Sequence, residues 1–110
     1  MDERCISKEC LNDTGFSYTL SLINGKYKMT ILYTLMEFKV VRFNEMKRYI
    51  GKISYKTLSS MLKELEADQL VHREEYPQIP PKVEYSLTER GKSLIPILDA
   101  LCEWGDKNRL

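Results

Sequence analysis

The sequence predicts a mainly helical fold with one small β-hairpin. Three observations lead to this prediction: helical spacing of hydrophobic residues over most of the chain, two short helices joined at a glycine, and one later stretch with a period of two. In this order the elements form a winged helix-turn-helix. A chain of 110 residues suits a single domain, residues 1–110, and is small enough to gain from oligomerisation.

Composition excludes several classes of protein. Residues 1–15, predicted as a flexible N-terminal segment, carry both signs of charge and no apolar core of a secretory signal. No apolar run approaches the roughly 20 residues of a membrane span, so we expect a cytoplasmic protein. The three cysteines, Cys5, Cys10 and Cys102, lack CxxC spacing, which argues against a disulfide scaffold and a zinc site. With one histidine, His72, and no phosphate loop or nucleophile motif, we expect neither an enzyme nor a cofactor.

Three short helices are predicted in the first half of the chain. Phe16, Leu20 and Ile23 lie at helical spacing and mark the first, which ends near Asn24-Gly25. The second, from about 26 to 37, is marked by hydrophobic residues at the same spacing: Tyr27, Ile31, Leu32, Leu35 and Met36. The third lies in RFNEMKRYIG, and its hydrophobic residues are Phe43, Met46 and Ile50. Its terminal glycine favours a tight turn into the next helix.

Residues 54–68 form the helix that carries the candidate chemistry. Ser54 is a natural N-cap, a contact worth roughly 1 kcal/mol. A core-facing stripe follows at i, i+3, i+4 and i+7: Leu58, Met61, Leu62 and Leu65. At about 100° per residue, small polar and cationic side chains occupy the opposite face and its flanks: Lys56, Thr57, Ser59, Ser60 and Lys63. With the preceding helix it makes a helix-turn-helix over residues 43–68, whose second member lies in the major groove.

A hairpin is predicted over residues 70–88. Val83, Tyr85 and Leu87 alternate with polar residues, as in a half-buried strand, and Leu70-Val71-His72 begins the strand before it. Between them the segment 76–82, YPQIPPK, holds three prolines, which cannot donate ladder hydrogen bonds and keep the tip stiff. A rigid hairpin that follows a helix-turn-helix is a wing.

The last predicted element is a helix over residues 89–109, with Thr88 as N-cap and a bend at Pro96. Its apolar arc covers roughly half of the circumference, wider than one packing face needs. We interpret the excess as a subunit interface, to which this helix contributes six residues: Leu94, Ile97, Leu98, Leu101, Cys102 and Trp104.

Charge is distributed unevenly although the net charge is only +1. Residues 1–25 carry a net charge of −2 and residues 64–110 a net charge of −4. Residues 26–63 hold nine Lys and Arg against two Glu, a net charge of +7. Clustered like charges repel one another in a folded protein, and a polyanion relieves that repulsion. The basic block, which contains the helix-turn-helix, therefore favours a nucleic-acid partner.

The assembled segments INGKYKMTILYTL, RFNEMKRYIGKIS and PQIPPKVEYSLTERG resemble the HxlR family of bacterial winged-helix transcription regulators, relatives of the MarR type. The resemblance covers about residues 17–105. It implies a homodimer with N- and C-terminal dimerisation helices, in which Phe16 and Leu20 of the first helix join the interface. It also implies that the helix 54–68 lies in the major groove and the wing on the minor groove or phosphates. Some family members sense oxidants through a cysteine that precedes the first helix. That position falls on Thr14 here, and the nearest cysteine, Cys10, lies four residues earlier.

These inferences predict a homodimeric regulator, a repressor in its commoner form, that binds a pseudo-palindromic operator in double-stranded DNA. Its expected DNA contacts lie on the helix-turn-helix and the wing: Arg42, Lys47, Arg48, Lys52, Ser54, Tyr55, Lys56, Thr57, Ser59, Ser60, Lys63 and Lys82. Tyr55 has a second interpretation, packing beside Phe43. No small-molecule effector can be named from the sequence.

Two alternative functions remain open at this point. The winged helix also serves as a docking module for proteins, although such a module has no need of a basic block. The chain could instead be a thiol-redox protein in which Cys10 reacts with oxidants.

Overall fold

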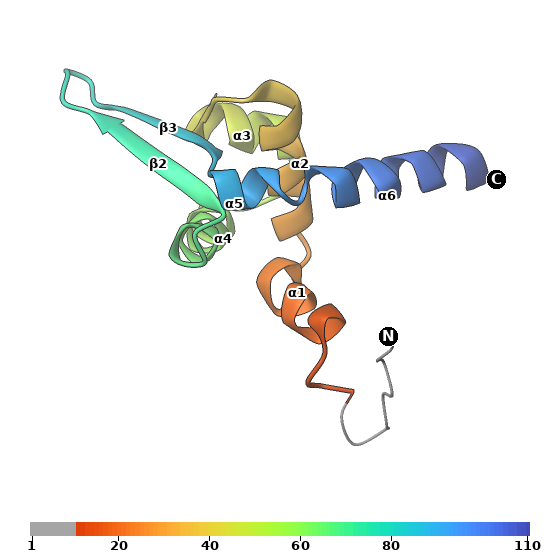
Figure 1. Cartoon of the computed structure of the whole chain (residues 1–110). Helices are drawn as coiled ribbons and strands as arrows, with labels where there is room; N and C mark the ends of the chain where they lie inside the picture. Colours follow the sequence, from red (N-terminus) through yellow and green to blue (C-terminus); the bar gives the residue numbers. More distant parts are fainter. Residues whose placement is uncertain (1–10) are drawn as a thin grey trace.

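The computed structural model describes residues 11–110, which form six helices and a small antiparallel sheet whose hairpin, β2 and β3, projects from the helices (Figure 1). The elements follow one another in this order: α1 (Gly15–Ile23), α2 (Lys28–Phe38), β1 (Val41–Arg42), α3 (Phe43–Ile50), α4 (Tyr55–Ala67), β2 (Val71–Tyr76), β3 (Lys82–Leu87), α5 (Glu89–Lys92) and α6 (Ile95–Asn108). The predicted fold class is confirmed.

Local signals set the ends of the helices as the sequence indicates. The Thr14 hydroxyl accepts from the Ser17 N–H at the start of α1, and the Ser54 hydroxyl accepts from the Thr57 N–H at the start of α4, both at 3.0 Å. At Arg42 the backbone N–H donates to the Glu45 carboxylate at 2.8 Å and begins α3. Gly51 ends α3 with φ +84°, a conformation that suits glycine.

The sheet differs from the predicted two-stranded hairpin, because it has three strands in the order β1-β3-β2. Val41 pairs with Tyr85 and Arg42 with Glu84, so the short connection between α2 and α3 forms an edge strand. A strand of two residues has no periodicity of its own, and the sequence analysis missed it. Its pairing fixes the start of α3 against the wing.

The core lies where α2, α3 and α4 pack against the inner face of the sheet. Fully buried hydrophobic side chains from each of these elements fill it: Ile31, Leu32, Leu35, Val41, Met46, Leu58, Leu62, Leu65 and Val71. One charged side chain is buried with them. Lys28 is 6% exposed, and its Nζ forms an ion pair with Glu64 of α4 at 2.6 Å. This pair ties α4 to α2 on the side away from the wing.

The C-terminal part of the chain does not form the single bent helix that was predicted. It consists of α5 and α6 with a turn at Ser93 and Leu94, and Pro96 stands in the first turn of α6. Proline has no N–H to donate and is tolerated at this position, so it begins a helix here where a bend was expected.

Glycine is required at one position in α5. Gly91 is buried, and a Cβ on it would overlap the carbonyl oxygen of Leu70. Around this contact the Thr88 hydroxyl donates to the Gln69 carbonyl at 2.6 Å and accepts from the Gly91 N–H at 2.9 Å. The backbone of α5 therefore lies directly against the start of β2.

Arg90 links three parts of the fold. Its Nε donates to the carbonyl oxygen of Asp68, the C-cap of α4, at 3.1 Å, and its Nη2 donates to the Tyr18 hydroxyl of α1 at 2.8 Å. A side chain of α5 thus holds the end of α4 and the middle of α1 together.

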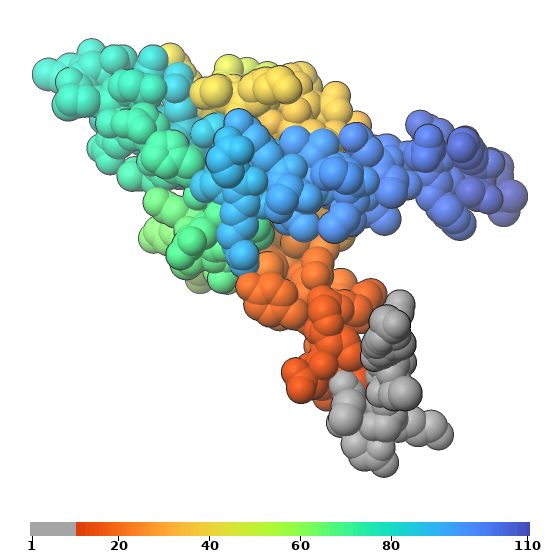
Figure 2. Space-filling model, viewed as in Figure 1, coloured from red at the N-terminus to blue at the C-terminus, as the bar shows by residue number. Residues whose placement is uncertain are grey.

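The wing, α1 and α6 project from the body of the molecule (Figure 2). None of the helices in residues 11–110 is long and apolar enough to span a bilayer. Over the same residues, no group of three or more His, Cys, Asp and Glu side chains could hold a metal ion.

Candidate nucleic-acid interface

Helix α4 presents the polar face that the sequence predicts. Leu58, Leu62 and Leu65 are buried beneath it, whereas Lys56, Ser60 and Lys63 are exposed on the other side. Ser59 is half-buried on the flank that faces the wing. The short side chains leave the helix backbone open to close approach by another molecule.

The hydroxyls of Ser54, the N-cap of α4, and of Thr57 already form hydrogen bonds within the protein. The Ser54 hydroxyl donates to the Thr57 hydroxyl at 2.9 Å and accepts from the Thr57 N–H, so both side chains hold the first turn of α4. These hydrogen bonds stabilise the start of the helix. The exposed lysines of the same helix, Lys56 and Lys63, are therefore more available than these two hydroxyls to donate to a ligand.

Tyr55 combines the two interpretations that the sequence leaves open. Its ring stacks on Phe43 with centroids 6.0 Å apart, and the Nζ of Lys47 lies 4.9 Å from the centroid of its ring. The side chain is nevertheless 61% exposed. Packing therefore holds the ring in place at the start of α4 while one side stays open to a partner.

The expected cations around α4 carry charge that the described protein does not neutralise. Within residues 11–110, six of them form no ion pair: Arg42, Lys47, Arg48, Lys52, Lys56 and Lys63. Lys28, which belongs to the same basic block in the sequence, is buried and paired with Glu64 and does not contribute to this surface. Arg42 and Arg48 line a hollow of about 560 Å³ between α3 and the wing tip, together with Pro80 and Pro81.

Lys82 lies at the first position of β3, on the outer face of the wing. It is half-buried, its Nζ lies 3.5 Å from the Glu84 carboxylate, and it stands 4.5 Å from the centroid of the Tyr76 ring. The negative charge of Glu84 is also the largest cause that raises the pKa of Tyr76. Lys82 is thus engaged within the wing, apart from the cations of α4. His72 lies on the same face, within hydrogen-bond distance of Glu74.

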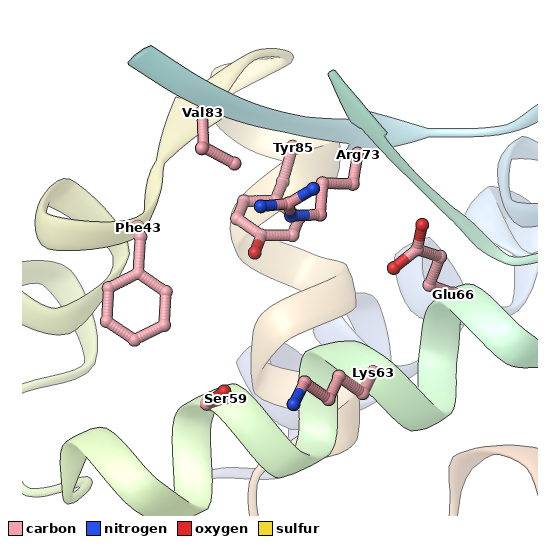
Figure 3. A pocket seen from close by; sticks show the side chains of 7 residues that line it. All are labelled: Phe43, Ser59, Lys63, Glu66, Arg73, Val83 and Tyr85. Carbon is pink, nitrogen blue, oxygen red and sulfur yellow. The ribbon is translucent and has the colours of Figure 1, made fainter. Parts of the chain in front are cut away.

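Arg73 is a cation near α4 that the sequence analysis did not select. Ser59, Lys63 and Glu66 of α4 line a hollow of about 390 Å³ below the wing, and Arg73 enters it from β2 (Figure 3). The remaining lining comes from Phe43, Val83 and Tyr85. Arg73 lies two residues after buried Val71 and pairs with Tyr85, so it belongs to the inner face of the sheet.

The predicted interface residues divide into three groups by their exposure. Large apolar side chains on α1 and α6 are exposed: Phe16 (71%), Leu20 (39%), Ile97 (46%), Leu101 (50%) and Trp104 (68%). Leu94 and Cys102 are half-buried. Leu98 was also expected in the interface, but it is 6% exposed because it packs in the core of its own chain.

A shallow apolar groove of about 290 Å³ runs between α2 and α6 and is lined by Met29, Tyr33, Leu101 and Cys102 among others. The pKa of Tyr33 is raised, first by the charge of Glu37 and then by Cys102. Cys10, the candidate redox residue, lies outside the described residues.

The model of the HxlR-like helix-turn-helix family matches residues 22–109. The chain is 66% identical, over 90% of its length and 88% of the relative's, to an HTH-type transcriptional regulator of Halalkalibacterium halodurans. It is also similar to the solved structure of the redox regulator HypR in its oxidised form, with a TM-score of 0.82 and 46% identity. The match covers 88% of this chain and 99% of the HypR chain. The solved structure of a MarR-family regulator of Porphyromonas gingivalis matches with a TM-score of 0.82 and 32% identity. The match covers 96% of this chain and 99% of that regulator's chain.

Proposed function

Because this chain belongs to the HxlR-like helix-turn-helix family of transcriptional regulators, which bind DNA, we infer that it acts as a homodimeric repressor at a pseudo-palindromic operator. One observation carries the DNA-binding part: within residues 11–110, six cations of α3, its flanking residues and α4 form no ion pair. On α4, Lys56 and Ser60 contact bases. Before α4 in the chain, four cations contact phosphates: Arg42, Lys47, Arg48 and Lys52.

The homodimer rests on the apolar side chains of α1 and α6. Ile97, Leu101 and Trp104 are exposed at helical spacing along one face of α6, and Phe16 is exposed on α1. A soluble monomer rarely leaves a large apolar patch uncovered. A second copy would cover this surface, and the groove beside Tyr33 and Leu101 offers a recess for its side chains. Two-fold symmetry then places two α4 helices on half-sites about one helical turn apart.

Lys56→Ala is expected to reduce affinity for the operator about 10-fold to 100-fold, because one good base contact is worth roughly 1–3 kcal/mol. Affinity for random-sequence duplex should fall much less. Band-shift titrations against both duplexes, at several salt concentrations, measure the two losses; the operator is first selected from a pool of genomic fragments. Lys92→Ala, an exposed lysine on α5, is the matched control.

Equal losses on the two duplexes would assign Lys56 to a phosphate. Operator binding by the wild-type protein that does not weaken with added salt would contradict the proposed function itself, since counterion release accompanies every neutralised phosphate.

A second candidate is regulation by thiol oxidation, favoured by the similarity to the redox regulator HypR. In this case oxidation of Cys10 alters operator affinity, and Cys10→Ser is expected to remove the response to a mild oxidant such as diamide. Free-thiol counts and band shifts on the same samples test it, with Cys102→Ser as the control. Unchanged affinity after Cys10 has been oxidised would reject this switch.

A further inference from the structure

The hollow between α4 and the wing combines features that match one repeating unit of a DNA strand. Lys63 and Arg73 enter it from opposite walls, and Ser59 adds a hydroxyl (Figure 3). Phe43 and Val83 line the side toward α3 with apolar surface. A phosphate group accepts hydrogen bonds from cations and hydroxyls, whereas the deoxyribose beside it offers mainly carbon atoms.

Strand register aims Arg73 at this hollow. Side chains two residues apart on a strand share one face, and Val71 on β2 is buried against the core. Arg73 continues that face, opposite Tyr85 of β3. It therefore points toward α4, while Lys82 belongs to the other face of the wing with Tyr76 and Glu84.

Two neighbours hold the Arg73 guanidinium in place. Buried Tyr85, its pairing partner on β3, lines the same hollow, and the Arg73 Nη1 lies 3.3 Å from the Glu75 carboxylate. Interaction with the Tyr85 side chain is the largest cause that raises the pKa of Arg73. A guanidinium has five N–H donors in a fixed plane, so donors remain for a ligand after these contacts.

We propose that this hollow seats one sugar-phosphate unit of the DNA strand that borders the major groove, with the phosphate held between Lys63 and Arg73 and the deoxyribose against Phe43 and Val83. The proposal rests on the proposed DNA-binding function and deepens it. It assigns Lys63 to the DNA backbone, whereas the sequence alone allowed Lys63 to contact either a base or a phosphate. It also adds Arg73 to the DNA contacts. Base recognition then falls to Lys56 and Ser60.

Glu66 limits this site at its far end. Its carboxylate lines the same hollow and repels a phosphate, so its charge opposes binding there. Charge changes at Arg73 and Glu66 should therefore alter affinity in opposite directions, which a change in fold stability does not explain.

Arg73→Gln is expected to weaken binding about 10-fold on both the operator and a random-sequence duplex, because a phosphate contact carries no sequence information. The slope of log affinity against log salt should become shallower by up to about 1.8, twice the value of about 0.9 for one phosphate, because a homodimer carries two such sites. Arg73→Lys should restore the slope and part of the affinity, and Glu66→Gln should strengthen binding. Lys92→Gln, which makes the same change of charge on α5, should match the wild type.

A scan with single methylphosphonates, each of which removes the charge of one phosphate, gives the decisive result. At one phosphate per half-site the neutral linkage should weaken wild-type binding more than it weakens binding by Arg73→Gln, which keeps only the Lys63 contact. Circular dichroism confirms that the variants are folded. If Arg73→Gln is not folded, Lys63→Gln, which removes the other cation of the site, gives the same test. If every neutral linkage weakens the wild type and the variant equally, the proposal is wrong although DNA binding stands. Loss of salt-dependent binding in the wild type would instead reject the proposed function.

Discussion

Gly91→Ala is expected to lower the free energy of unfolding by about 3 kcal/mol, in the range of the largest effects of single substitutions. The added methyl group would overlap the carbonyl oxygen of Leu70, which is backbone and cannot rotate away. Relief requires α5 to move off the start of β2, and this movement would break the hydrogen bonds of Thr88 with Gln69 and Gly91. Urea denaturation followed by circular dichroism, at one fixed protein concentration, measures the change.

Gly15→Ala is the matched control, because a Cβ at Gly15 meets nothing within 4 Å. It should be neutral or slightly stabilising. Unfolding free energies for the two variants that agree within about 0.5 kcal/mol would show that α5 does not lie as close to Leu70 as described.

Leu101→Asp combined with Trp104→Glu is expected to convert the proposed dimer to a monomer and to lower operator affinity at least about 100-fold. Two charges on the exposed apolar face of α6 would oppose its burial against a second copy. A monomer would bind one half-site without the gain that a linked second site provides, typically 10²–10⁴ in affinity. Sedimentation equilibrium measures the mass, and band shifts measure the affinity.

Glu103→Ala, which removes an exposed acid on another face of α6, should leave both measurements unchanged. A double variant that remains dimeric would place the subunit interface elsewhere. A double variant that is monomeric yet binds the operator as tightly as the wild type would separate dimerisation from DNA binding.

Prediction from sequence succeeded where the determinants are local. The Ser54 cap, the hydrophobic stripe of α4 and the glycine that ends α3 all lie within a few residues of what they determine, and these elements are confirmed. The exposed polar face of α4 follows from the same periodicity, because a helix that buries Leu58 and Leu62 must direct Lys56 and Ser60 outward.

The features that were missed depend on distant partners. The strand β1 exists only because β3 pairs with it more than 40 residues later. The sequence places Lys28 in a basic block, but Glu64 pairs with it and removes it from the surface. The orientation of Arg73 depends on its pairing with Tyr85, and a count of charges along the chain does not reveal this pairing.

Arg90 also constrains the geometry of a dimer. It bonds to Tyr18 on α1 and to the carbonyl end of α4. If α1 belongs to the surface that joins two copies, a tilt of α1 must either break these bonds or carry the end of α4 with it. The distance between the two α4 helices, and with it the number of base pairs that a matching operator places between its halves, is then set partly by one arginine side chain far from the DNA.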